Sequence, residues 1–93
     1  MIVGLLEIEI LIPGSESLKD KRIVIKSIKD LISKKFNASV AEIDFLDKWQ
    51  RSLIAFAVVS NSKSFTEDVL QKIFHQLDKD QRFEICRQRF EYK

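Results

Sequence analysis

The chain has 93 residues, a size that one compact core accounts for, so we expect a single domain over residues 1–93. Hydrophobic residues make up 45% and charged residues 32%, which is typical of an ordinary globular protein and excludes a disordered or fibrous chain. Two Gly, one Cys and one His exclude an internal disulfide, a Cys/His metal cage and a glycine-rich phosphate loop.

The N-terminal segment alternates between apolar and polar residues. From Ile2 to Ile12 the even positions are Ile, Leu or Gly, whereas Glu7 and Glu9 occupy odd positions. A period of two with β-branched residues predicts a strand whose even face points inward. The two glutamates argue against a signal peptide, and no run approaches the roughly 20 apolar residues that span a bilayer. We therefore expect a cytoplasmic protein with no membrane partner, and a single thiol, Cys86, suits a reducing compartment.

A helix is predicted next, because Pro13-Gly14-Ser15 ends the strand. Ser17-Leu18-Lys19-Asp20 has the capping-box pattern, in which the Ser oxygen and the carboxylate three residues later each accept a hydrogen bond from a free backbone N–H. Apolar residues continue at helical spacing as far as Phe36, so the pattern predicts a helix over residues 18–36.

Two strands are predicted after this helix. Residues 37–46 alternate again, with Glu42 and Asp44 on the side that we expect to be open. A turn is predicted at 47–48. Residues 53–59 are apolar on both sides, which is typical of a central strand.

The C-terminal third predicts a second helix and a last strand. Ser64-Phe65-Thr66-Glu67 repeats the capping-box pattern and should begin a helix that ends near Asp80. The last strand covers about 82–92, and its apolar parity changes at Cys86. Such a change predicts a β-bulge or a loosely held edge.

The order β-α-β-β-α-β with right-handed crossovers predicts an α+β fold, the ferredoxin-like sandwich. Its four-stranded antiparallel sheet has the order 4-1-3-2, with two helices on one face. The other face must meet water or a partner.

Charge is segregated along the chain. Over residues 18–36 seven Lys or Arg stand against two Asp, a net +5, which leaves −3 for the remainder of a chain whose net charge is +2. Steps of three and four residues predict one solvent-facing stripe of cations. The stripe residues are Lys19, Arg22, Lys26 and Lys29. Lys21 also lies near the helix start, where the macrodipole attracts an anion. Such a stripe could track a phosphate backbone; the alternative is a solvated helix face.

The open sheet face is expected to be mixed in character. Its expected charged residues are Glu7, Glu9, Glu42, Asp44, Arg51, Arg87 and Arg89. RNA binding through a sheet of this topology needs stacking aromatics on the third strand, where only Phe56 stands. A face with both charged and apolar residues fits a self-complementary homodimer interface better, and the alternative is a set of paired surface charges. Nearby arginines argue against Mg²⁺ at the carboxylates.

Trp49-Gln50-Arg51 follows the predicted hairpin turn. An indole, an amide and a guanidinium at such a turn could stack on and hydrogen-bond a base or a peptide. The alternative is that Trp49 packs over the end of the hairpin.

Signatures of catalysis are missing. The loop over 13–17 lacks the Arg of an acylphosphatase and the Cys-x-x-Cys of a metallochaperone. His75 lies on the polar side of its predicted helix, away from any nucleophile, and Cys86 is expected to be a small core or edge residue. We therefore expect no catalytic residue, no metal, no cofactor and no enzymatic activity.

Four pieces of the chain closely resemble the YlxP-like family of small bacterial proteins. They are residues 17–22 (Ser-Leu-Lys-Asp-Lys-Arg), 36–42 (Phe-Asn-Ala-Ser-Val-Ala-Glu), 49–51 (Trp-Gln-Arg) and 58–61 (Val-Val-Ser-Asn). The resemblance implies a ferredoxin-like protein of unknown function. The genes of the family commonly lie near those for translation initiation factor two and ribosome-binding factor A, which implies a link to ribosomes or RNA by association only.

Our leading hypothesis is a non-enzymatic, RNA- or ribosome-associated protein, with ribosomal RNA or a ribosomal subunit as its partner. Its nucleic-acid-binding residues are predicted to be Lys19, Lys21, Arg22, Lys26, Lys29, Trp49 and Arg51. The alternative is a homodimeric regulatory or scaffold module that associates through the open sheet face and has no nucleic-acid role.

Overall fold

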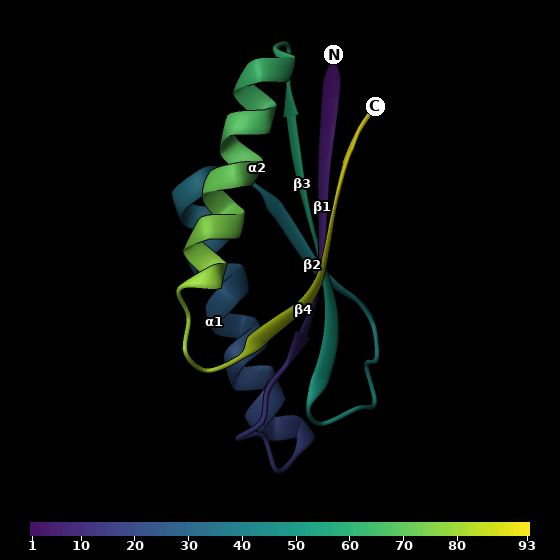
Figure 1. Ribbon diagram of the computed structural model, residues 1–93, viewed down its shortest axis with the longest axis vertical. Helices are drawn as coiled ribbons and strands as arrows, with labels where there is room; N and C mark the ends of the chain where they lie inside the picture. The colour runs from purple at the N-terminus through teal and green to yellow at the C-terminus, as the bar shows by residue number, and fades with distance from the viewer.

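Four antiparallel strands and two helices make up the molecule, whose computed structural model describes all 93 residues. The elements are β1 (Ile2–Leu11), α1 (Leu18–Phe36), β2 (Ser39–Asp44), β3 (Arg51–Ser60), α2 (Lys63–Asp78) and β4 (Glu84–Tyr92). The strand order is β2-β3-β1-β4, and both helices lie against the same face of the sheet (Figure 1). The predicted ferredoxin-like arrangement is therefore confirmed.

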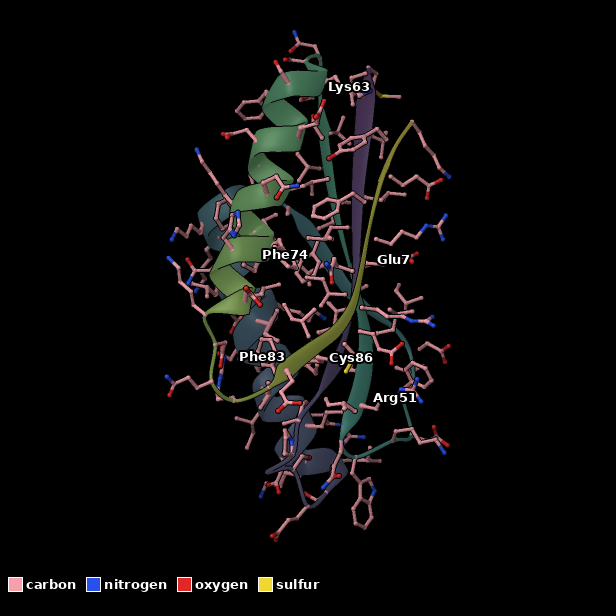
Figure 2. All side chains as sticks on the ribbon, viewed as in Figure 1. Glu7, Arg51, Lys63, Phe74, Phe83 and Cys86 are labelled. Atoms are coloured by element: carbon pink, nitrogen blue, oxygen red, sulfur yellow. The ribbon has the colours of Figure 1, made fainter.

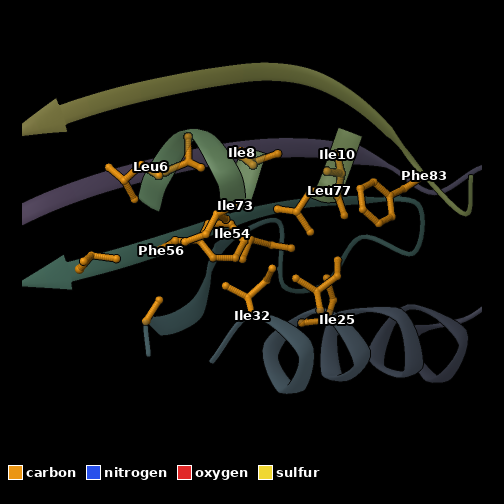
Figure 3. Close-up of a cluster of buried hydrophobic side chains, with 14 of the residues drawn as sticks. Leu6, Ile8, Ile10, Ile25, Ile32, Ile54, Phe56, Ile73, Leu77 and Phe83 are labelled. Carbon is orange, nitrogen blue, oxygen red and sulfur yellow. The ribbon is translucent and has the colours of Figure 1, made fainter. Parts of the chain in front are cut away.

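The core lies between the sheet and the two helices. In the two central strands, Leu6 pairs with Phe56 and Ile8 pairs with Ile54, and none of these four side chains is more than 1% exposed. The predicted inward parity of β1 is thus confirmed. Sixteen buried hydrophobic residues from the sheet, both helices and the adjoining loops form one cluster (Figure 3), and burying each large one contributes about 1.5–3 kcal/mol.

The helix ends follow their local sequence, with one difference. At the start of α1 the Ser17 hydroxyl accepts a hydrogen bond from the backbone N–H of Asp20 at 3.0 Å, as predicted. The predicted start of α2 at Ser64 is wrong, because Ser62 is the N-cap and accepts from the N–H of Phe65. The Phe65 side chain is exposed. Neither helix contains an apolar stretch long enough to cross a membrane.

A β-bulge interrupts the pairing of β4 with β1. Glu9 pairs with Arg87, whereas Ile10 pairs with Ile85, so Cys86 is the extra residue. The change of apolar parity in the sequence predicted this irregularity, which is confirmed.

A second register shift, in β2, makes the predicted parity of this strand wrong at Glu42, whereas Asp44 lies on the open side as predicted. Glu42 pairs with the core residue Ile54, so its side chain lies on the helix side of the sheet, and Asp44 pairs with the outward-facing Leu53. Ile43 is the extra residue between these pairs, and its side chain is 51% exposed. The shift lets a carboxylate reach the inner side, where a buried cation of α1 binds it.

Candidate nucleic-acid interface

The outer flank of α1 displays a row of cations, which we call the basic stripe. Its members are Lys19, Arg22, Lys26 and Lys29, all of them exposed. Lys26 forms an exposed ion pair with Asp30 at 3.3 Å, and the other three have no ion pair. Because steps of three and four residues keep side chains on one side of a helix, these four predicted residues lie along one line.

The basic stripe borders the edge strand β2. Arg22, Lys26 and Lys29 line a shallow hollow of about 450 Å³ that also includes Glu42 at the edge of the sheet. Three cations therefore share this hollow with two carboxylates, because Asp30 also lines it. Asp30 is paired with Lys26, and Glu42 is neutralised from the inner side by Lys21. Arg22 and Lys29 thus keep their attraction for anions.

Lys21 does not belong to the stripe, which corrects the prediction that it binds nucleic acid. Its side chain is 1% exposed, and its ammonium lies 2.9 Å from Glu42. The same ammonium donates to the carbonyl oxygens of Phe45 at 2.8 Å, Arg51 at 3.3 Å and Leu46 at 3.4 Å. A buried ammonium persists only where such acceptors surround it, so Lys21 joins α1 to the loop between β2 and β3.

The signal for this burial is present in the sequence. Lys21 precedes Ile25, Ile28 and Ile32 at spacings of four, three and four residues, which is the inner face of α1. Its carboxylate partner also accepts a hydrogen bond from Ser52 at 2.6 Å.

The loop that carries Trp49, residues 45–50, is held on both sides. Gln50 donates to the carbonyl oxygen of Ser15 at 2.9 Å, and its own carbonyl oxygen accepts from the N–H of Ile12 at 2.8 Å. Trp49 nevertheless remains 55% exposed, so the end of the hairpin covers it only in part. It lines a hollow of about 470 Å³ together with Leu11, Lys48, Gln50 and Arg51.

Arg51 lies on the open face of the sheet, with its side chain directed away from the helices (Figure 2). Its guanidinium binds Glu9 at 2.8 Å and lies 4.1 Å from the centre of the Phe45 ring. The structure therefore does not bring Arg51 together with the basic stripe. The alternation of β3 carries this signal, because Arg51 has the opposite parity from the buried Ser52.

Three of the four pieces that carry the family resemblance meet at one junction. Residues 17–22 supply the cap of α1 and Lys21, residues 36–42 supply Glu42, and residues 49–51 supply the Gln50 side chain and the Arg51 carbonyl. Ser17, Lys21, Glu42 and Gln50 therefore have a structural role.

The open sheet face is hollowed where charges of both signs meet. A depression of about 620 Å³ is lined by Glu7, Glu9, Asp44, Phe45, Leu53, Arg87, Gln88 and Arg89. Arg87 has no ion pair, and Arg89 lies 3.9 Å from Glu7. Beyond the charges, Val59 is 64% exposed on the same face. Glu42, which was expected here, lies on the other side.

Chemistry-bearing groups elsewhere are scattered. No three His, Cys, Asp or Glu side chains come together as a cation site. His75 is exposed on α2 beside Phe74, and Cys86 is exposed in the bulge rather than in the core.

The three groups whose pKa is shifted, Asp80, Arg82 and Tyr92, also lie outside the basic stripe. Hydrogen bonding from the Arg82 guanidinium lowers the pKa of Asp80. Burial, and secondly the charge of Glu67, raise the pKa of Tyr92 above its usual 10.0.

Comparison with known proteins finds a family model and a relative that each match most of this chain. A family model described as "Protein of unknown function (DUF503)" matches residues 3–90. The uncharacterized protein YlxP of Bacillus subtilis (strain 168) is 40% identical over 77 residues, which cover 83% of this chain and 84% of that protein. The resemblance to the YlxP-like family is thereby confirmed.

Proposed function

We propose that this chain, which belongs to the DUF503 family of proteins of unknown function, is a non-enzymatic, cytoplasmic protein that associates with RNA or ribosomes. The observation that carries the proposal is the exposed basic stripe, where Lys19, Arg22 and Lys29 have no ion pair. Like charges at these spacings repel by a few tenths of a kcal/mol per pair. Phosphate groups of a nucleic-acid backbone would remove that repulsion, and the counterions they release would favour binding.

The hypothesis is tested by binding ribosomal RNA and purified ribosomal subunits over a range of salt concentrations. The stripe variant replaces four residues: Lys19→Gln, Arg22→Gln, Lys26→Gln and Lys29→Gln. A control variant with the same change of charge replaces cations of other elements: Lys72→Gln, Lys79→Gln, Arg87→Gln and Lys93→Gln.

Each phosphate contact contributes about −0.7 to −0.9 to the slope of log K against log salt. We therefore expect the stripe variant to lose a slope of about 3 and the control variant to lose little. Equal binding by the stripe variant and the parent protein, or no binding by the parent, would refute the proposal.

A second function is supported by the open sheet face, where we propose self-association into a homodimeric regulatory or scaffold module. The exposed Val59 lies on the same face as adjacent rows of Glu and Arg. A two-fold axis could place the carboxylates of one copy opposite the arginines of the other. Sedimentation at high micromolar concentration should show a dimer that Val59→Asp dissociates and Ile23→Asp, on the exposed side of α1, does not. A parent protein that stays monomeric rules this out.

A further inference from the structure

We propose that Trp49 is a stacking platform for one unpaired nucleobase, so that the protein prefers single-stranded or loop RNA over a duplex; this inference rests on the proposed RNA function. The indole makes no polar or aromatic contact within the fold. It is 55% exposed, its Nε1 donates no hydrogen bond, and no ring or cation packs on it. An exposed indole of this kind offers a large planar surface to a ligand.

The backbone beneath this indole is fixed. Lys21 binds the carbonyl oxygens of Phe45 and Arg51 on the two sides of the loop, and Gln50 binds the neighbouring loop at Ser15. A ligand that stacks on Trp49 therefore does not have to order the loop, which lowers the entropic cost of binding.

The surroundings of the indole favour a nucleotide over an apolar side chain of a protein. The hollow of about 470 Å³ includes the partly exposed side chain of Leu11 beside Trp49. Lys48, which also lines this hollow, has no ion pair. An aromatic face with a free ammonium next to it matches a base with its phosphate, the arrangement that single-strand-binding proteins use.

The loop of Trp49 also contacts the first turns of α1, where the basic stripe begins. Lys21, which touches both sides of the loop, stands between Lys19 and Arg22 in the first turns of α1. An RNA strand that follows the stripe toward the start of α1 therefore arrives at the loop of Trp49. In a duplex both faces of each base are covered by its neighbours, so only an unpaired base can use the indole.

The chain offers a direct measurement, because Trp49 is its only tryptophan. A mixed-sequence oligoribonucleotide is titrated as a single strand and as the duplex with its complement, and Trp fluorescence is followed beside an independent binding signal. We expect the single strand to quench the fluorescence to saturation, whereas the duplex binds the stripe without quenching.

The variants separate this inference from the function on which it rests. Trp49→Leu should weaken single-strand binding about tenfold or more, the usual value of one stacked base, and leave duplex binding unchanged. Trp49→Phe should restore part of the loss. Phe65→Leu, which changes an equally exposed aromatic residue on α2, should have no effect. Circular dichroism confirms that each variant is folded.

Three outcomes would overturn the inference. The first outcome is that the parent protein binds both RNAs without fluorescence quenching and Trp49→Leu binds them with the same affinity. The platform is then refuted, while the RNA function stands. If neither RNA binds, the proposed function fails and the platform with it. If Trp49→Leu keeps RNA binding but loses binding to RNA-free ribosomal proteins, the indole belongs to a protein contact instead.

Discussion

The buried ammonium of Lys21 gives the sharpest prediction about stability. Lys21→Met keeps most of the apolar stem but removes the charge that Glu42 and three backbone carbonyl oxygens surround. Breaking a buried ion pair by removing one partner costs about 3–5 kcal/mol, because the other charge stays behind without compensation. The Glu42 side chain is 16% exposed and keeps its hydrogen bond from Ser52, so we expect the lower value, about 3 kcal/mol.

Removing the other partner should cost less. In Glu42→Gln the ammonium keeps its three carbonyl acceptors and gains an amide oxygen in place of the carboxylate, so a loss of about 1–2 kcal/mol is expected. The double variant leaves no uncompensated carboxylate, and it should therefore be more stable than the sum of the two single changes predicts.

Equilibrium unfolding in urea, followed by circular dichroism, measures these differences. With a slope of about 1–2 kcal/mol per molar urea for a small domain, Lys21→Met should lower the midpoint by roughly 2 M. Lys19→Met, an exposed lysine two residues earlier, is the matched control and should change stability by less than about 0.5 kcal/mol. A loss below about 1 kcal/mol for Lys21→Met, or an equal loss for Lys19→Met, would refute the assigned role.

Three further predictions concern packing and titration. Gly4→Ala directs a methyl group into Thr66 of α2, so urea unfolding should show a loss of about 1–3 kcal/mol, and unchanged stability contradicts this contact. Because Arg82 lowers the pKa of Asp80, that carboxylate stabilises the fold above its unfolded pKa of about 3.9, and the stabilisation disappears as the pH falls through the lower folded pKa. Asp80→Asn should flatten this acid dependence of stability; an unchanged profile refutes it. Burial raises the pKa of Tyr92, the only tyrosine, so ultraviolet titration should give a midpoint above 10.0, and stability should fall as the pH rises from about 10 through that midpoint.

The basic stripe shows how much of a candidate site can be predicted from local sequence. Lys19, Arg22, Lys26 and Lys29 were placed on one exposed line from spacing alone, because helix geometry is a local property. The strand alternation of β1 and the bulge at Cys86 were predictable for the same reason.

The remaining site residues depended on partners from distant segments. Glu42 was placed on the wrong side because a bulge at Ile43 puts Glu42 and Asp44 on opposite faces of the sheet, and the inward-facing Glu42 meets the buried ammonium of Lys21, a residue of another element. Arg51 is drawn into an ion pair with Glu9, a residue of another strand.

The sequence by itself determined the element order, the fold and the basic stripe of this protein, since periodicity and caps act within a few residues. Only the tertiary structure decided which polar groups bind partners inside the fold and which remain exposed to a ligand. That distinction depends on burial and on hydrogen-bond partners 24 to 30 residues away. The tertiary structure shows that Lys21 is buried and so does not belong to the candidate site, whereas Trp49 is exposed on a loop held by hydrogen bonds.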